Sequence, residues 1–263
     1  MSTLSETLER YRKLGIAQQL DYEKLYLYSI ITHSTAIEGS TVTEIENQLL
    51  FDEGLSANRP LAEVLMNLNL KHAYEAGLGA AKAHAEISTE LLCNLSAKVM
   101  KDTGADYNTL AGSFSSASGD LRRFNVSAGR GGRSYLSWQK VPIRLQEFCD
   151  WLNARRKKLS PEQVDEVYDL SFLAHYHLVL IHPWADGNGR MSRLLMNMVQ
   201  TEFDVVPSIV KKEIRIAYIS ALAEAREQED EAIFVRFMRE HHVRNLEEQI
   251  LDFLKSQEEP AGF

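Results

Sequence analysis

The sequence predicts an all-α protein that carries one small β-hairpin. Helical signals, with recognisable caps and stops, run through most of its 263 residues. Residues 110–142 interrupt them with a stretch rich in Gly and Ser, in which short β-prone pieces flank "AGRGG". A long irregular excursion inside a helical domain usually has a function, so we expect a β-hairpin flap here. The alternative is a disordered surface loop.

Local signals place the helices along the chain. Residues 22–38 read as a helix that stops at Gly39, and Thr43 with Glu46 forms a capping box that opens the next helix. Ser160 followed by Pro161 predicts another helix start, with Ser160 as the cap. The remaining helices are expected over residues 60–84, 88–104, 213–228 and 232–255.

Composition and charge exclude several classes of protein. The net charge of −8 argues against a dedicated nucleic-acid binder, which carries a basic stripe. No apolar run approaches the ~20 residues that span a bilayer, so no membrane segment is expected. The polar N-terminus does not resemble a signal peptide. Cys93 and Cys149 sit among apolar residues and are expected to be free thiols, which favours a cytoplasmic location.

The most informative stretch is "IHPWADGNGRMSRLLMNMVQ", residues 181–200. Pro183 ends the preceding helix at His182, and "DGNG" favours a turn because Gly and Asn accept positive φ. In the helix that follows, an apolar stripe is expected on one face and a polar stripe on the other. The apolar stripe is Met191, Leu194, Leu195 and Met198, and the polar stripe is Arg190, Arg193 and Asn197.

This arrangement has the parts of a phosphate site. Backbone N–H groups of Gly187, Asn188 and Gly189 can form an anion-binding nest, to which the helix N-terminus adds its positive end. Arg190 and Arg193, three residues apart, can clamp outer phosphates with planar forks.

Two neighbouring side chains add chemistry to that cradle. Asp186 suits Mg²⁺, which takes one or two carboxylates together with phosphate oxygens. His182 can accept a proton near neutral pH.

Simpler interpretations exist for each part. A lone "DGNG" is usually a turn, a lone His is usually structural, and Trp184 is expected to pack in the core. A zinc site made by His175, His177 and His182 is disfavoured because His177 does not share the helix face of the other two.

The stretch "HPWADGNGRMSR" resembles the motif of the Fic family, His-Pro-Phe-x-Asp/Glu-Gly-Asn-Gly-Arg-x-x-Arg, with Trp184 in place of Phe. In "GDLRRFNVS", Gly119, Arg122 and Val126 resemble the entry to the family's flap. The later "AYISALAEAREQED" resembles its helix near the nucleotide base, although Arg226 stands where an Asn is often found.

The resemblance implies a Fic-type helical domain over residues 88–240, an N-terminal helical region over 1–87 and a C-terminal helix and tail over 241–263. It implies transfer of AMP from ATP to a Ser, Thr or Tyr hydroxyl of a target protein, which the flap aligns by strand addition. The implied roles are His182 as general base, Asp186 for Mg²⁺, Gly187, Asn188, Gly189 and Arg190 around the phosphates, Arg193 at the γ-phosphate, and Tyr218, Ile219 and Leu222 near the adenine.

Glu38 is unusual because a carboxylate at a helix C-terminus faces the negative end of the helix dipole. The run from Ser34 through Glu38 to Gly39 resembles the family's inhibitory motif, Ser/Thr-x-x-x-Glu-Gly/Asn. The resemblance implies that Glu38 pairs with Arg193 and so occupies the residue that should take the γ-phosphate. An exposed, solvated Glu38 is the plain alternative.

The leading prediction is therefore an autoinhibited protein adenylyltransferase. One alternative is the reverse reaction, in which Glu38 positions a water that removes AMP from a modified protein. Another is a nucleotide-responsive interaction module with negligible turnover, against which the intact His182 argues. A homodimer is compatible with the resemblance.

Overall fold

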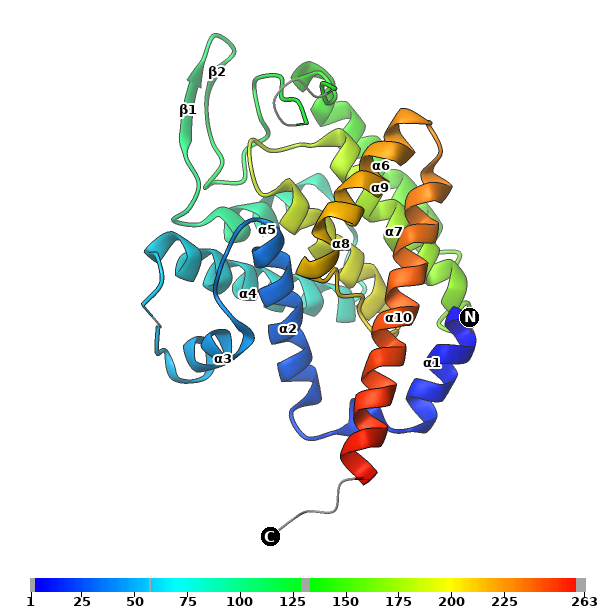
Figure 1. The fold of residues 1–263 in the computed structure, drawn as a ribbon. Helices are drawn as coiled ribbons and strands as arrows, with labels where there is room; N and C mark the ends of the chain where they lie inside the picture. Colours follow the sequence, from blue (N-terminus) through cyan, green and yellow to red (C-terminus); the bar gives the residue numbers. More distant parts are fainter. Residues whose placement is uncertain (1–2, 57, 129–132, 259–263) are drawn as a thin grey trace.

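The computed structural model describes residues 3–56, 58–128 and 133–258. They form a mostly helical protein with one two-stranded antiparallel sheet, which confirms the predicted fold class (Figure 1). The longer helices are α1 (Leu4–Lys13), α2 (Tyr22–Ile37), α3 (Glu44–Glu53), α4 (Leu61–Lys82), α5 (Thr89–Met100), α6 (Val141–Arg156), α7 (Val164–Ile181), α8 (Asn188–Glu202), α9 (Arg215–Glu227) and α10 (Glu231–Glu258). Short 3-10 turns lie at Ile16–Gln18, Trp138–Lys140 and Lys212–Ile214.

Helix α8 lies at the centre of the core and packs against α7 and α4. Every residue from Met191 to Gln200 is buried, so the expected apolar stripe is present but the polar stripe is buried as well. Asn197 is satisfied there because the Tyr74 hydroxyl donates to its Oδ1 over 2.8 Å. Buried polar groups usually find a hydrogen-bond partner, as Asn197 does here.

The first and last helices of the described chain pack against each other and against α7. Helix α10 packs along α9, α7 and α1, and Figure 1 shows α1 beside α10. The Tyr11 hydroxyl on α1 donates to Oε1 of Gln249 on α10 over 2.8 Å. None of the helices in the described residues has the length and apolar character needed to cross a membrane.

Of the two capped helix starts predicted, at Thr43 and Ser160, the first is present and the second is displaced. Thr43 and Glu46 form the expected capping box of α3. Helix α7, however, begins at Val164 and not at Ser160, because Gln163 has a non-helical backbone (φ −83°, ψ 57°). Gln163 Oε1 does accept from the Ser160 N–H over 3.1 Å, but this contact closes a turn ahead of the helix.

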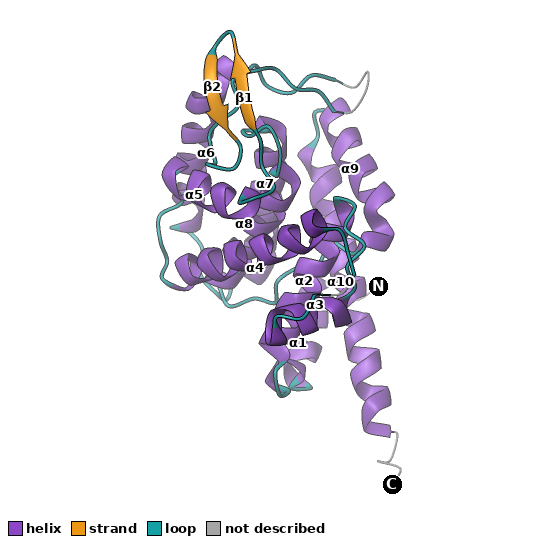
Figure 2. Cartoon of the chain, turned by 90° about the vertical axis from the view of Figure 1, so that its left-hand side faces the viewer, coloured by secondary structure: helices purple, strands orange, loops and turns teal. Residues whose placement is uncertain are grey.

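The hairpin also lies earlier than predicted. Its strands are β1 (Asp106–Thr109) and β2 (Gly112–Ser115), and Figure 2 shows them at the opposite end of the molecule from the C-terminus. On either side of "AGRGG" the described residues pair through an isolated bridge between Ser127 and Ser134. Two backbone hydrogen bonds flank it, from Tyr135 N–H to the Val126 carbonyl and from Ala128 N–H to the Arg133 carbonyl. The predicted tip, residues 129–132, lies outside the described residues, as does the end of the tail, 259–263. The flap discussed below is the segment 119–138.

Candidate active site

His182 lies at the C-terminus of α7 with a left-handed backbone (φ 50°). The residue before a proline is disfavoured in the α region, which ends the helix here. The ring Nδ1 lies 3.2 Å from the Val179 carbonyl, and since a carbonyl only accepts, Nδ1 carries the proton. The lone pair is therefore on Nε2. Burial lowers the pKa of His182 to about 4, so the ring is neutral at pH 7.

Trp184 and Asn188 shape the turn after His182. The indole of Trp184 is fully buried, and its N–H donates to the Gly119 carbonyl over 3.1 Å. The Asn188 side chain accepts from the Trp184 N–H and donates to the Trp184 carbonyl, over 3.1 and 2.9 Å. Asn188 thus holds the loop with its side chain, while Gly187 takes a positive φ of 81° at the start of α8.

The carboxylate of Glu38 covers the start of α8. A Cβ built on Gly189 would come 2.5 Å from Glu38 Oε1. The same oxygen lies 2.6 Å from Nη2 of Arg193, so the predicted pair is present. The anionic group therefore occupies the glycine-bounded space beside the first turn of α8, where partial positive charge favours anions.

Arg193 is 3 % exposed, and its guanidinium bonds to the C-terminal part of α2 and also interacts with the Tyr218 hydroxyl of α9. Its Nε donates to Ser34 Oγ over 2.8 Å, and its Nη2 donates to the Ser34 carbonyl over 3.0 Å as well as to Glu38. Burial alone would raise the pKa of Glu38, but the charge and hydrogen bond of Arg193 outweigh it and lower this pKa. Glu38 is therefore ionised at neutral pH.

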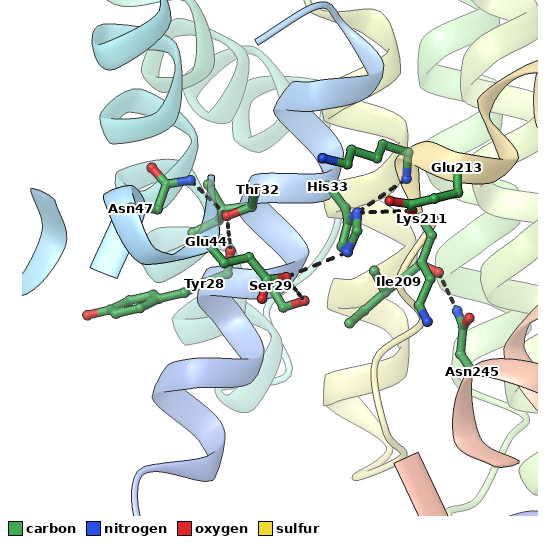
Figure 3. A network of polar contacts seen from close by, with 12 residues as sticks. Tyr28, Ser29, Thr32, His33, Glu44, Asn47, Ile209, Lys211, Glu213 and Asn245 are labelled. Carbon is green, nitrogen blue, oxygen red and sulfur yellow. Dashed lines mark hydrogen bonds and ion pairs between the residues drawn. The ribbon is translucent and has the colours of Figure 1, made fainter. Parts of the chain in front are cut away.

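A polar network anchors α2 in this position. Thr35 Oγ1 donates to Asn67 Oδ1 over 2.8 Å, and the Asn47 amide donates to Thr32 Oγ1 over the same distance. On the other side of α2, His33 Nδ1 accepts from the Lys212 N–H over 3.2 Å (Figure 3). Contacts with α3, α4 and the 3-10 turn after α8 thus hold the helix that carries Glu38.

Arg190 is buried without a full set of partners. It is 3 % exposed, and within the described residues its Nε and Nη1 have no hydrogen-bond partner. Its Nη2 lies 3.2 Å from Met100 Sδ and 3.6 Å from Asp186 Oδ1. A buried cation with unpaired donors is costly unless an anion joins it, so this position favours a phosphate.

Asp186 is the exposed carboxylate at the mouth of the loop. Its side chain is 64 % exposed, and Oδ1 accepts from the Gly187 N–H over 2.5 Å. It remains accessible to a cation from solvent.

Arg122 connects the flap to the histidine turn, a role that the sequence did not reveal. It is 1 % exposed, its Nε donates to the His182 carbonyl over 2.7 Å, and its Nη1 donates to the Phe124 carbonyl over 2.8 Å. Its Nη2 donates to the Leu136 carbonyl on the other arm of the flap. One guanidinium thus ties both arms of the flap to the turn that carries His182.

Residues 86–200 match the family model described as "Fic/DOC family". This segment is a Fic domain. The match contains the whole loop from His182 to Arg193 and the flap entry from Gly119 to Val126.

The similarity to named relatives covers more of the chain than the Fic-domain match does. The chain is 28 % identical over 239 residues to "Protein adenylyltransferase fic-1" of Caenorhabditis elegans, covering 87 % of this chain and 42 % of that protein. It is 33 % identical over 213 residues to "Protein adenylyltransferase Fic" of Drosophila mojavensis, covering 79 % and 38 %. The chain thus spans about two fifths of the length of these relatives.

Solved structures share the fold. A Fic domain containing signaling protein from Bacteroides thetaiotaomicron superimposes with a TM-score of 0.76 at 21 % identity, over 99 % of this chain and 100 % of that one. A fragment of Fic-1 from C. elegans superimposes with a TM-score of 0.70 at 23 % identity, over 94 % and 70 %. At these identities the likeness concerns the fold.

The residues expected near the adenine differ in burial, and the most buried of them, Tyr218, interacts with Arg193. Tyr218 is 3 % exposed, and its hydroxyl hydrogen-bonds to Nε2 of His175 over 2.7 Å, within the core. Leu222 is half-buried and packs on the core edge, and Ile219 is 43 % exposed. The structure therefore leaves Leu222 and Ile219 open to a ligand more than the Tyr218 hydroxyl.

The histidines considered for zinc do not gather. His175 is bonded to Tyr218, and His177 Nε2 lies 2.6 Å from Glu231 Oε2. In residues 3–56, 58–128 and 133–258, no three His, Cys, Asp or Glu side chains come together in a way that could hold a metal alone. Cys93 and Cys149 are free thiols.

Proposed function

We propose that this chain is an autoinhibited protein adenylyltransferase, which transfers AMP from ATP to a Ser, Thr or Tyr hydroxyl of a target protein. The observation that carries the proposal is the position of the Glu38 carboxylate, against Gly189 and bonded to Arg193. An anion fills a cradle built for anions, in a Fic domain whose named relatives are called adenylyltransferases.

The chemical step starts at Nε2 of His182. This lone pair takes the proton of the acceptor hydroxyl as its oxygen attacks the α-phosphorus of ATP. A new P–O bond forms, the bond from the α-phosphorus to the oxygen that bridges to the β-phosphate breaks, and pyrophosphate leaves. The neutral state of His182 at pH 7 suits it to this role.

The start of α8 positions the triphosphate. Gly187 and Gly189 let the phosphates approach the backbone N–H groups of the helix N-terminus. Arg190 offers buried unpaired donors, and Arg193 would bind the outermost phosphate once Glu38 releases it. Phosphoryl transfer depends mainly on such positioning and charge neutralisation.

The residues present fit a Mg²⁺ ion that arrives with ATP. Asp186 offers one exposed carboxylate beside the cradle, and Mg²⁺ is usually held by one or two carboxylates plus phosphate oxygens. When bound, the ion would neutralise charge that develops on the phosphates.

Inhibition follows from competition for Arg193. While Glu38 is paired with Arg193, its carboxylate occupies the position where the outermost phosphate of ATP would bind. Two anions in that space would repel each other strongly. The bound nucleotide then takes a pose unfit for attack.

The test uses purified protein with ATP labelled at the α-phosphate and Mg²⁺, following AMP on the protein itself and on lysate proteins. Glu38→Gly should label far more strongly than wild type, and Glu38→Gly with His182→Ala should not label. Equal labelling by Glu38→Gly and wild type would refute inhibition by Glu38. Persistent labelling without His182 would remove this residue from the mechanism.

The reverse reaction is a second candidate, favoured by one observation. Glu38 is ionised inside the site yet 34 % exposed, so it can accept a proton from a water. Release of AMP from an AMP-modified peptide by wild type, and its loss in Glu38→Gln, would support this activity.

The domain limits also stay proposals. We place the functional Fic unit over 88–240, with Tyr218, Ile219 and Leu222 toward the adenine. Residues 1–87 then supply the inhibitory helix α2, and residues 241–263 complete α10 and its tail.

A further inference from the structure

Tyr135, a flap residue, lies face to face with His182. The ring centroids are 3.8 Å apart, and the planes differ by 14°. The backbone N–H of Tyr135 donates to the Val126 carbonyl over 2.9 Å, which fixes this arm of the flap against the other. The flap therefore contacts the imidazole of His182 directly through the Tyr135 ring.

Arg226 of α9 also lies over the phenol ring of Tyr135. Its guanidinium carbon lies 4.7 Å from the ring centroid, an arrangement that favours cation–π attraction. It also donates to the carbonyls of Ser134 and Arg133, the latter over 3.3 Å. Arg133 in turn donates to the Arg226 carbonyl over 3.3 Å, so the end of α9 and the flap hold each other.

The phenol of Tyr135 thus stacks on the imidazole of His182 and is also contacted by the guanidinium of Arg226, and these three groups are called the stack below. Two contacts then fix the imidazole of His182: the Val179 carbonyl holds Nδ1, and the Tyr135 face sets the plane of the ring. Because stacking uses the face of a ring, the Nε2 edge stays free for an acceptor hydroxyl.

We propose that Tyr135 is a positioning residue for His182 and that Arg226 is the latch that keeps Tyr135 on the imidazole. This inference rests on the proposed function, in which His182 is the base. It couples the flap to the chemistry: the segment that would align a target strand also orients the atom that removes the target's proton.

The environment of His182 supports this role. Burial is the main cause of its low pKa, and Tyr135 covers one face of the ring. The other charged groups that act on it are Arg122 and Arg226, which lower its pKa, and Asp186, which raises it. Removing the phenol should expose the ring and raise the pKa of His182 toward its ordinary value.

The test compares Tyr135→Ala, Tyr135→Phe and Arg226→Ala, each in the Glu38→Gly background. Tyr135→Ala should lower kcat by about 10-fold to 100-fold, the scale of a misplaced catalytic group, while KM for ATP changes less than twofold. The acid limb of the kcat/KM profile should move to higher pH. Tyr135→Phe keeps the stacked face and should retain both values.

Arg226→Ala should shift kcat and the acid limb in the same directions as Tyr135→Ala does, by smaller amounts. Tyr135 is still present in this variant, but Arg226 no longer holds it against the imidazole. Arg123→Ala is the matched control. Arg123 is another flap arginine that donates to a backbone carbonyl, that of Ala111, and it has no part in the stack. It should leave kcat and the acid limb unchanged.

A direct titration of the His182 ring by NMR, without nucleotide, separates this inference from the proposed function. A raised pKa in Tyr135→Ala supports the stack even if no AMP transfer occurs. An unchanged pKa and acid limb in both Tyr135→Ala and Arg226→Ala would overturn the inference. A change only in KM for the target, with kcat intact, would assign Tyr135 to target binding and also overturn it.

Discussion

Oε1 of Glu38 lies 2.6 Å from Nη2 of Arg193, although 155 residues separate the two in the chain. The pair joins the end of α2 to the first turns of α8. The same guanidinium also bonds the side chain and the carbonyl of Ser34. Three hydrogen bonds therefore hold Arg193, and substitutions can remove the two that come from side chains, those of Ser34 and Glu38.

Ser34→Ala should raise AMP transfer above wild type but less than Glu38→Gly does. It removes one hydrogen bond to a charged group, for which roughly 1.5–3 kcal/mol is typical, while the Ser34 carbonyl and Glu38 still hold Arg193. Self-labelling with ATP measures the effect. Ser29→Ala is the control, because Ser29 on the same helix bonds Glu44 instead. Labelling at the wild-type level by Ser34→Ala would contradict a role of the Ser34 side chain in holding Arg193.

Without ligand, Glu38→Gly should unfold at a lower temperature than wild type. ATP with Mg²⁺ should raise the unfolding temperature of Glu38→Gly more than that of wild type. Arg193 would remain buried without its carboxylate, at a cost of about 1–3 kcal/mol, until a phosphate replaces it. Thermal unfolding with and without ATP measures both effects. AMP, which lacks the outer phosphates, should stabilise the two proteins alike. If ATP raised the unfolding temperature of both proteins equally, Glu38 would not occupy the binding position of the outer phosphate.

The difference in stability between wild type and Glu38→Gly should depend on pH. Arg193 holds the folded-state pKa of Glu38 below the ordinary value for Glu, so the ion pair stabilises the fold fully at pH values above that ordinary value. Its contribution disappears as the pH falls through the lowered folded value. The difference in stability between wild type and Glu38→Gly should shrink accordingly.

Gly189→Ala should weaken ATP binding by about 10-fold or more in the Glu38→Gly background. The backbone of Gly189 is helical and accepts a Cβ, but the added carbon would fill the space that Glu38 Oε1 occupies and lie 3.2 Å from Arg193 Nη1. Calorimetry measures the affinity. Gly79→Ala on α4 is the matched control, since its Cβ would meet nothing within 4 Å. Unchanged ATP affinity in Gly189→Ala would place the phosphates elsewhere.

His242→Phe should make the protein less sensitive to acid. His242 is 2 % exposed and its ring lies tilted beside that of Tyr168. Among the described residues neither of its ring nitrogens has a hydrogen-bond partner. Burial lowers the pKa of His242 to about 3. The unfolded chain binds this proton near pH 6.5, so stability falls as the pH drops from there toward 3, by up to about 1.4 kcal/mol per unit.

Denaturant unfolding at several pH values tests this expectation. The free energy of unfolding of His242→Phe should decline less steeply than that of wild type between pH 6.5 and 4. Phe has a similar shape and leaves no buried polar atom, so stability at pH 7 should be kept. Parallel curves would show that His242 does not carry the acid sensitivity.

Local sequence determined the parts of the site that consecutive residues build. Pro183 had to end a helix at His182, and Gly187 had to open the next one, because backbone sterics fix both outcomes. Capping residues such as Thr43 likewise placed α3 correctly. At Ser160 the residues close a turn, and the local signal therefore placed the helix start at Pro161, three residues before the observed start at Val164.

Tertiary structure decided everything that depends on distant segments meeting. Spacing alone gave no sign that Glu38 would reach Arg193, and only the family resemblance implied it. The partners of Tyr135 and Arg226 were likewise open, because their stack needs α9, the flap and the histidine turn to converge. Sequence patterns act over a few residues, whereas the packing of α8 among its neighbours selects which far-apart side chains share one small buried space.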